Sequence, residues 1–322
     1  MRAAVYRRYG GPDVVQVEEV PKPVPKAGEV LVRVRATTVS MGDYRLRSRD
    51  LPRGMKILSS LALGVFGPRN KVLGMDIAGT VEAVGEGVTR FSPGDAVIAL
   101  TGAQFGGHAE FKVMREDAAI TRAPSNMDFE DAVALIFGGH TAHAFLSRAG
   151  IKAGDEVLIN GASGAVGTSA IQIAVALGAT VTAVCSAGNA DLVRELGATH
   201  VIDYAREDFA TAGRQYDAVM DCVGNAPFER SARVVKPGGT LMLVVADLPA
   251  MLAARRDGKR AGIRVDAGQV PSTAQVLGEL VKLAETGKLR PVIDRRYRLD
   301  DIAEAHRYLD TGRKRGALVV AP

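Results

Sequence analysis

Short apolar runs, separated by clusters of Gly and Pro, fill roughly the first 125 residues of the chain. Within the runs, apolar and polar residues alternate or β-branched residues dominate, which is typical of strands bounded by turns. The predicted strands are 3–9, 14–20, 29–40, 77–85, 95–100 and 111–117. Many short strands with frequent turns favour a barrel or a sandwich, so we predict a β-rich domain here.

The pattern changes near residue 126, where short apolar runs begin to alternate with longer segments of helical spacing. Ser125 or Asn126 is expected to cap the first helix, with acidic residues in its first turn. The predicted strands are 156–160, 180–185, 200–204, 216–224, 239–245 and 263–266, and the predicted helices are 165–178, 189–197 and 227–235. This alternation predicts a doubly wound parallel sheet over 126–265.

After residue 265 the chain again has short predicted strands like those of its first 125 residues. After an amphipathic helix at 272–286 come a strand at 291–299, a helix at 300–311 and a last strand at 316–320. We therefore predict that 266–322 returns to the domain formed by 1–125, in an α/β protein of two domains. The segment 45–70 is expected to be a loop that forms a lid or pocket wall for an apolar molecule, or that packs against a partner subunit. Its apolar residues include Leu51, Met55, Ile57, Leu58, Leu61, Leu63 and Phe66.

The stretch NGASGAVG (160–167) joins a predicted strand to a predicted helix, and the next strand begins at Thr180. Glycines in this context allow a tight turn and a close approach of the backbone to a pyrophosphate, while the helix offers unpaired N–H groups. We predict that this turn binds a dinucleotide. The expected contacts are Gly161, Ser163, Gly164, Ala165, Val166 and Gly167.

The end of the second strand bears on which dinucleotide is bound. A carboxylate there would hydrogen-bond the ribose 2′-hydroxyl of NAD, but the tip CSAGN (185–189) carries none. Ser186 and Asn189 can donate hydrogen bonds to a 2′-phosphate, and Tyr204 at the end of the third strand can add another. No Lys or Arg stands at the tip itself, which leaves Arg194 or Arg206 as sources of charge. We predict NADPH, with use of both cofactors as the alternative.

Taken in order, these motifs resemble the medium-chain dehydrogenase/reductase superfamily, and most closely its zinc-free quinone oxidoreductase branch, which includes zeta-crystallin. The resemblance rests on VLGMDIAGTVEAVGEGVTRFSPGDAVIAL, FGGHAEF, VLINGASGAVGTSAIQIAVALGA, VVKPGGTLMLV and DDIAEAHRYLDTGRKRGALVV, among others. It implies a GroES-like β-barrel domain interrupted by a Rossmann domain. It also implies hydride transfer from NADPH in a cleft between the domains, and a homodimer is expected.

Zinc-dependent members of the superfamily carry Cys and His where this chain has Ser40 and Met75. Hydroxyl and thioether groups are poor substitutes for thiolate and imidazole ligands, so we predict no metal site. Without a Lewis acid, the favoured acceptors are already electron-poor: quinones or α,β-unsaturated carbonyls. Two alternatives stay open. The first is a reductase of enoyl thioesters or alkenals, and the second is an NADPH-binding protein with a sensor or structural role.

The resemblance also assigns residues around the nicotinamide. Tyr44 would orient a carbonyl, pass a proton or pack against the cofactor. Ser40 would make a polar contact, and His140 would either enter the cleft or simply begin a helix. The remaining expected cofactor contacts are Thr141, Cys222 and Gly224, the strand end Leu243, Val244 and Val245, and Arg315.

Composition narrows the class of protein further. Lys and Arg number 41 against 36 Asp and Glu, and no nucleic-acid-binding motif accompanies this small excess, so we expect no nucleic-acid partner. The basic run 255–260 is interpreted as solvated surface. The two cysteines exclude a Cys-rich zinc lobe and a disulfide framework. No apolar run approaches the ~20 residues that span a bilayer, and no secretory signal is visible, so we expect a cytoplasmic protein.

Overall fold

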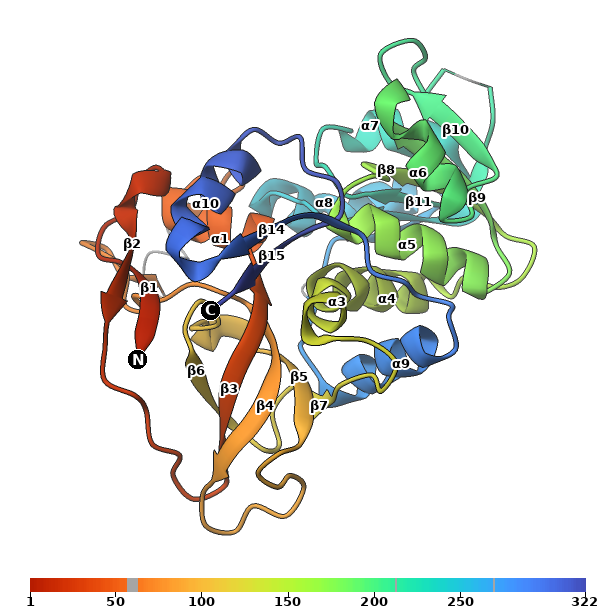
Figure 1. Cartoon of the computed structure of the whole chain (residues 1–322). Coiled ribbons are helices and arrows are strands. Elements are labelled where there is room, and N and C mark those ends of the chain that lie inside the picture. Colours follow the sequence, from red (N-terminus) through yellow and green to blue (C-terminus); the bar gives the residue numbers. More distant parts are fainter. Residues whose placement is uncertain (57–62, 212, 269) are drawn as a thin grey trace. The chain divides into compact units, whose positions relative to one another are not determined.

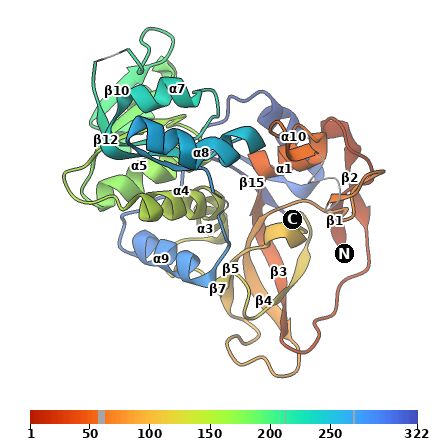
Figure 2. The same cartoon turned by 180° about the vertical axis from the view of Figure 1, so that it is seen from behind.

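The computed structural model describes residues 1–56, 63–211, 213–268 and 270–322 (Figures 1 and 2). The chain forms two compact units. Unit 1 comprises Met1–Leu51, Lys56–His140 and Ser272–Pro322, and unit 2 comprises Pro52–Met55 and Thr141–Pro271. The domain limits predicted from the sequence, at 125 and 265, stay a prediction.

Unit 1 is built on a mostly antiparallel sheet, in which only the C-terminal pair β14 and β15 is parallel. Its strand order is β14-β15-β3-β4-β5-β7, and β6 also pairs with β3. These strands are β3 (Glu29–Thr38), β4 (Asp76–Val84), β5 (Ala96–Leu100), β6 (Phe111–Arg115), β7 (Ile120–Arg122), β14 (Ile293–Arg298) and β15 (Ala317–Ala321). Val319 of β15 lies opposite Thr38 of β3, so the C-terminal strand joins the sheet that contains β3. A separate hairpin pairs β1 (Arg2–Tyr6) with β2 (Val15–Glu19).

Alternation along β3 explains why this segment is a strand. Val32 and Val34 are buried in the core of the sheet, whereas Arg33 and Arg35 between and beyond them are exposed. The helices that lie wholly or partly in unit 1 are α1 (Met41–Ser48), α3 (Phe129–Ala134), α4 (Ile136–Ala149), α9 (Ala274–Glu285) and α10 (Ile302–Asp310). On α10, the apolar face formed by Ile302, Ala305 and Leu309 packs in a cluster with β15 and β1.

Two predictions for unit 1 are wrong in detail. The segment 45–70 is not wholly a loop, because residues 45–48 belong to α1, which begins with a capping box between Ser40 and Asp43. The cap of α3 is Asp128, whose side chain accepts from the N–H of Asp131, whereas the hydroxyl of Ser125 donates to Glu285 instead. Ile57, Leu58 and Leu61 lie outside the described residues.

Unit 2 is a parallel sheet of six strands in the order β10-β9-β8-β11-β12-β13. The strands are β8 (Glu156–Asn160), β9 (Thr180–Cys185), β10 (His200–Asp203), β11 (Tyr216–Asp221), β12 (Val235–Leu243) and β13 (Arg264–Asp266). The helices are α5 (Ala165–Ala176), α6 (Ala190–Glu195), α7 (Phe228–Ser231) and α8 (Leu248–Ala261). Figure 1 presents α5 and α6 in front of this sheet and Figure 2 presents α8 on the other side, so helices cover both faces as predicted.

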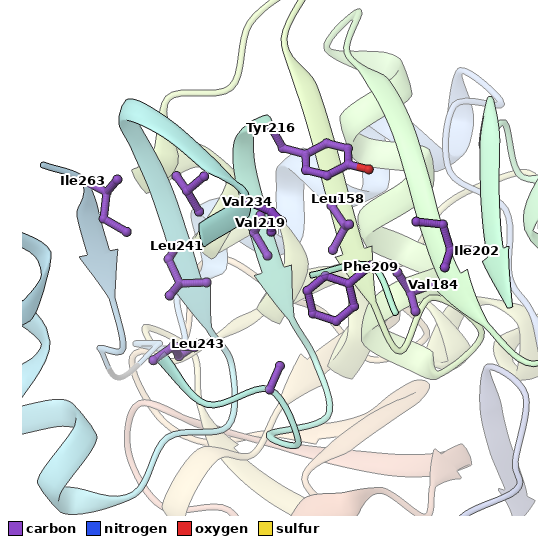
Figure 3. Packing of buried hydrophobic residues seen from close by; sticks show 12 residues of the cluster. Leu158, Val184, Ile202, Phe209, Tyr216, Val219, Val234, Leu241, Leu243 and Ile263 are labelled. Carbon is purple, nitrogen blue, oxygen red and sulfur yellow. The ribbon is translucent and has the colours of Figure 1, made fainter. Parts of the chain in front are cut away.

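The core of unit 2 combines aliphatic side chains from adjacent strands with the rings of Phe209 and Tyr216 (Figure 3). Leu158, Val219 and Leu241 come from β8, β11 and β12 and are fully buried. The predicted helix 227–235 is shorter than expected, since Val235 already begins β12 and Pro237 cannot continue a helix. Helix α8 was not predicted. The basic run 255–260 lies on it and is largely exposed, which confirms its interpretation as surface.

The strand order reverses at β8. The chain proceeds from β8 outward to β9 and β10, then returns to place β11 on the other side of β8. In open parallel sheets, ligands bind outside the carboxyl ends of the strands at such a reversal. The fold therefore directs attention to the ends of β8, β9 and β11. In the described part of the chain, no helix has both the length and the apolar character needed to cross a bilayer.

Candidate functional site

The glycine turn follows β8 directly, and its conformation requires glycine. Gly161 has φ +77°, in the left-handed region. A Cβ on Gly167 would lie 2.3 Å from the carbonyl oxygen of Gly161, so the first turn of α5 packs too closely on the loop for any larger residue. The backbone thus forms the tight strand-to-helix turn that the sequence predicted.

The N-terminus of α5 is open to an anion. Gly164 is its N-cap and makes no side-chain hydrogen bond to the helix, so the first N–H groups of α5 have no cap from the protein. Ser163, Ala165 and Val166 are partly exposed beside it. Unpaired N–H groups and the positive end of the helix dipole favour a phosphate at this place. The residues present fit a pyrophosphate.

A polar cluster links this turn to the tip of β9. The side-chain nitrogen of Asn189 donates to Ser163 Oγ at 3.0 Å and to Ser186 Oγ at 3.2 Å. The backbone N–H of Tyr204 donates to the carbonyl oxygen of Cys185 at 3.2 Å, which brings the end of β10 to the same edge, and the Tyr204 side chain is exposed. Four of the predicted cofactor residues therefore gather at one edge of the sheet.

A second polar cluster, at the end of β11, was missed by the sequence analysis. Asp221 is buried, and its Oδ1 accepts from Asn160 Nδ2 at 2.9 Å and from the N–H groups of Val223 and Gly224. It thereby ties the end of β8 to the turn after β11. The signal was a carboxylate that directly follows the apolar run Ala218–Met220 at the end of a predicted strand.

The predicted residues on β11 and β12 lie on either side of this turn. Gly224 has φ +83°, and a Cβ on it would come within 2.7 Å of Val245. The N–H of Val244 donates to the carbonyl oxygen of Asp221 at 3.0 Å, and Leu243 is buried. Burial, and then the charge of Asp221, raise the pKa of the Cys222 thiol, so Cys222 is not an activated nucleophile.

In unit 1, Ser40 serves as the N-cap of α1. It is buried, its hydroxyl donates to Asp43 Oδ2 at 2.6 Å, and Asp43 Oδ1 accepts from the N–H of Gly74 at 2.8 Å. Asp43 thus links the cap of α1 to the backbone before β4. The hydroxyl of Tyr44, in the same helix, donates a hydrogen bond to Asp50 Oδ2 at 2.8 Å. This hydrogen bond and burial raise the pKa of Tyr44.

The other predicted residues near the nicotinamide are placed as follows. His140, in α4, is buried, and Thr141 beside it is partly exposed. Arg315 is exposed in unit 1, where its N–H donates to Asp294. Their roles, like those of Ser40 and Tyr44, stay predictions.

The two positions that correspond to metal ligands do lie together. A Cβ on Gly42 would lie 2.3 Å from Met75 Sδ and 3.3 Å from Ser40 Oγ. They offer a thioether and a hydroxyl already used in a helix cap, a donor set unsuited to zinc. Among the residues that the structure describes, no group of three or more His, Cys, Asp and Glu side chains is placed to hold a metal ion.

Next to Met75, Asp76 is a fully buried carboxyl group at the start of β4. Its Oδ1 accepts from the N–H and the hydroxyl of Thr38, each at 2.9 Å. Burial, opposed by these hydrogen bonds and reinforced by the charge of Asp43, raises its pKa to about 7. A second group of buried polar side chains lies in the same unit, where the rings of His108 and His306 stack edge to face at 5.9 Å.

Comparison with known proteins places these features in a family. Residues 26–125 match the family model of the alcohol dehydrogenase GroES-like domain, and residues 196–320 match that of the zinc-binding dehydrogenases. A 2-methylene-furan-3-one reductase from Solanum lycopersicum is 32% identical over 338 residues, which cover 100% of this chain and 79% of that protein. The chain belongs to the medium-chain dehydrogenase/reductase superfamily.

Other members are similarly close. A chloroplastic NADPH-dependent alkenal/one oxidoreductase from Arabidopsis thaliana is 32% identical over 334 residues, covering 100% of this chain and 80% of its own. The quinone oxidoreductase structure from Coxiella burnetii has a TM-score of 0.89 and 30% identity, with coverage of 100% and 99%. The predicted fold class, a GroES-like domain with a Rossmann-type sheet, is confirmed. The chain is an oxidoreductase of this superfamily, whose members bind a nicotinamide cofactor.

Proposed function

We propose that this oxidoreductase uses NADPH to reduce quinones or α,β-unsaturated carbonyls and does so without zinc. The observation that carries the proposal is the edge of unit 2 where the uncapped N-terminus of α5 meets Ser163, Ser186 and Asn189, with no carboxylate at the tip of β9. This edge suits both a pyrophosphate and a 2′-phosphate.

Two sets of residues would hold the cofactor. Gly161, Gly164 and the N–H groups of Ala165 to Gly167 would bind the pyrophosphate, and Ser186, Asn189 and Tyr204 would face the adenosine ribose. Thr141, Cys222, Gly224 and the strand end 243–245 would contact the nicotinamide half. When bound, NADPH supplies a hydride from C4 of its nicotinamide ring.

The proposed acceptors follow from the donor set in unit 1. Ser40 and Met75 offer no Lewis acid site, so the acceptor must be electron-poor without activation by a metal. The names of the relatives support the same class of acceptor, since furanones, alkenals and quinones are all conjugated acceptors. Tyr44 is our candidate for orienting the acceptor carbonyl, with Ser40 and His140 as further candidates.

An assay with purified protein tests the proposal. NADPH oxidation, followed by absorbance, would be measured with a panel of a quinone, an alkenal, an enone and an enoyl thioester, before and after treatment with a metal chelator. We expect turnover with quinones or enones that the chelator leaves unchanged. Loss of activity on chelation would refute zinc independence. NADPH binding with no turnover on the whole panel would favour the non-catalytic alternative.

We also propose that the protein acts as a homodimer in the cytoplasm. The branch that the sequence resembles supports the dimer, and the location is the one expected from the sequence analysis. Light scattering coupled to size-exclusion chromatography would give the mass to compare with twice the 33.9 kDa of one chain. A monomer across the accessible concentration range would contradict the dimer. Cell fractionation followed by immunoblotting would test the location.

A further inference from the structure

Asn189 makes an unusual pair of contacts at the proposed cofactor edge. It ends the short turn Ala187–Asn189 between β9 and α6 (Figure 1), and its single side-chain nitrogen donates to two serine hydroxyls. One of them, Ser163, belongs to the glycine turn 26 residues earlier, and the other, Ser186, to the tip of β9. All three side chains are partly exposed.

These contacts decide the direction in which the hydroxyls can donate. An amide NH₂ group has two hydrogens to give and no lone pair to receive, so both serine oxygens must accept from it. Each hydroxyl then keeps its own proton for another partner. Within the described part of the chain, neither Ser163 nor Ser186 donates a hydroxyl hydrogen bond to the protein. The cluster therefore presents two oriented O–H donors beside the positive N-terminus of α5.

No Lys or Arg stands at the tip of β9 itself, residues 185–189. Arg194, the nearest basic residue along the chain, is paired with Asp191 at 3.0 Å. Donors without a cation recognise an anion by geometry more than by charge. A phosphate monoester has three acceptor oxygens, whereas the ribose hydroxyl of NADH has one oxygen and a proton of its own.

We propose that Asn189 is a specificity-determining residue that positions Ser163 and Ser186 as donors to the 2′-phosphate of NADPH. The proposal rests on the proposed use of NADPH and adds how that cofactor is distinguished from NADH. Hydrogen bonds to a charged group contribute enough for a preference of about ten- to a hundredfold. Because no fixed cation takes part, this preference changes little with ionic strength, unlike one that depends on a Lys or Arg clamp.

The experiment compares two cofactors and two fragments. The ratio of kcat/KM for NADPH and NADH would be measured for the wild type, Asn189→Leu, Ser163→Ala/Ser186→Ala and the triple variant. Calorimetry would give the Kd of 2′,5′-ADP and of 5′-AMP, which differ only in the 2′-phosphate and need no turnover. Asn70→Leu is the matched control, since Asn70 also donates its amide, to Ala103, but lies in unit 1.

We expect Asn189→Leu to lower the NADPH preference about tenfold or more, because kcat/KM should fall much further for NADPH than for NADH. In the double-serine background the same substitution should have no further effect, because Asn189 acts through the two hydroxyls. Asn70→Leu should leave the preference unchanged.

Three results would overturn the inference. Equal losses for NADPH and NADH would mean that Asn189 only supports the fold, and additive effects with the serines would mean that it acts independently of them. A preference abolished by Arg206→Ala alone would assign the selectivity to a cation. Failure of the proposed cofactor use is distinct from all three, because the wild type would then bind 2′,5′-ADP no more tightly than 5′-AMP.

Discussion

The buried carboxyl group of Asp76 makes the stability of this protein depend on pH in a direction opposite to that of most carboxylates. In the folded chain its pKa is about 7, against an ordinary value of 3.8. The unfolded chain therefore releases this proton near pH 4, whereas the folded chain keeps it until pH 7. The contribution of Asp76 to the free energy of unfolding falls as pH rises between these values and is constant above pH 7.

The magnitude follows from the shift. About three pKa units at 1.36 kcal/mol each give a loss of roughly 4 kcal/mol above pH 7 relative to a neutral group. Asp76→Asn removes the ionisation, keeps an oxygen for the N–H of Thr38 and offers an NH₂ to the Thr38 hydroxyl. We expect the variant to be more stable than wild type by about 2–4 kcal/mol at pH 8.5 and nearly equal to it at pH 4.

Urea unfolding followed by far-UV circular dichroism measures this, since the chain has no Trp to report by fluorescence. Curves at several pH values between 4 and 9 would give the difference between variant and wild type. Asp117→Asn is the control, because Asp117 is exposed and its hydrogen bond to Arg115 lowers its pKa. A difference for Asp76→Asn that stays constant with pH, or a variant less stable than wild type at pH 8.5, would refute the reasoning.

Three further substitutions test other parts of the structure. Gly167→Ala places a Cβ 2.3 Å from the Gly161 oxygen, so the free energy of unfolding should fall by about 1–3 kcal/mol. The Kd for NADPH, measured by calorimetry, should rise. An unchanged Kd would contradict the close approach of α5 to the glycine turn. Burial holds the pKa of His306 well below its ordinary 6.5, so its contribution to stability is present above pH 6.5 and is lost as pH falls. His306→Leu should therefore make the urea midpoint fall less between pH 7 and pH 5 than it does in wild type. An unchanged pH dependence of the midpoint would contradict this contribution. Tyr44→Phe should lower kcat by about tenfold or more if its hydroxyl orients or protonates the acceptor, whereas unchanged steady-state kinetics would favour simple packing.

The parts of the fold that the sequence predicted well are those with a local cause. The glycine turn and the strands around it are encoded by neighbouring residues, namely the apolar run before Gly161, the glycines themselves and the helical spacing after Ala165. Helix α1 escaped prediction because five of its eight residues are charged or hydroxylated and no clear apolar stripe marks it. Its cap, Ser40 followed by Asp43, was a readable signal.

The polar clusters could not be predicted because their members are far apart in the chain. Thr38 and Asp76 meet only when β3 and β4 pair, and His108 meets His306 only when the C-terminal segment packs on the first domain. Composition revealed each residue type but not its partner. Asn189 illustrates the difference. The sequence identified it as a hydrogen-bond donor, and the structure shows the two serine hydroxyls that accept its hydrogen bonds.

The place of β15 has a consequence for how the chain is made. This strand lies between β14 and β3 in the sheet of unit 1, so β3 lacks one of its neighbours until β15 is synthesised. Unit 2, apart from Pro52–Met55, is continuous from Thr141 to Pro271 and is complete well before that. Domains fold as units during synthesis and usually in order from the N-terminus. In this chain the continuous part of unit 2 is synthesised before the strand that lies between β14 and β3 in unit 1.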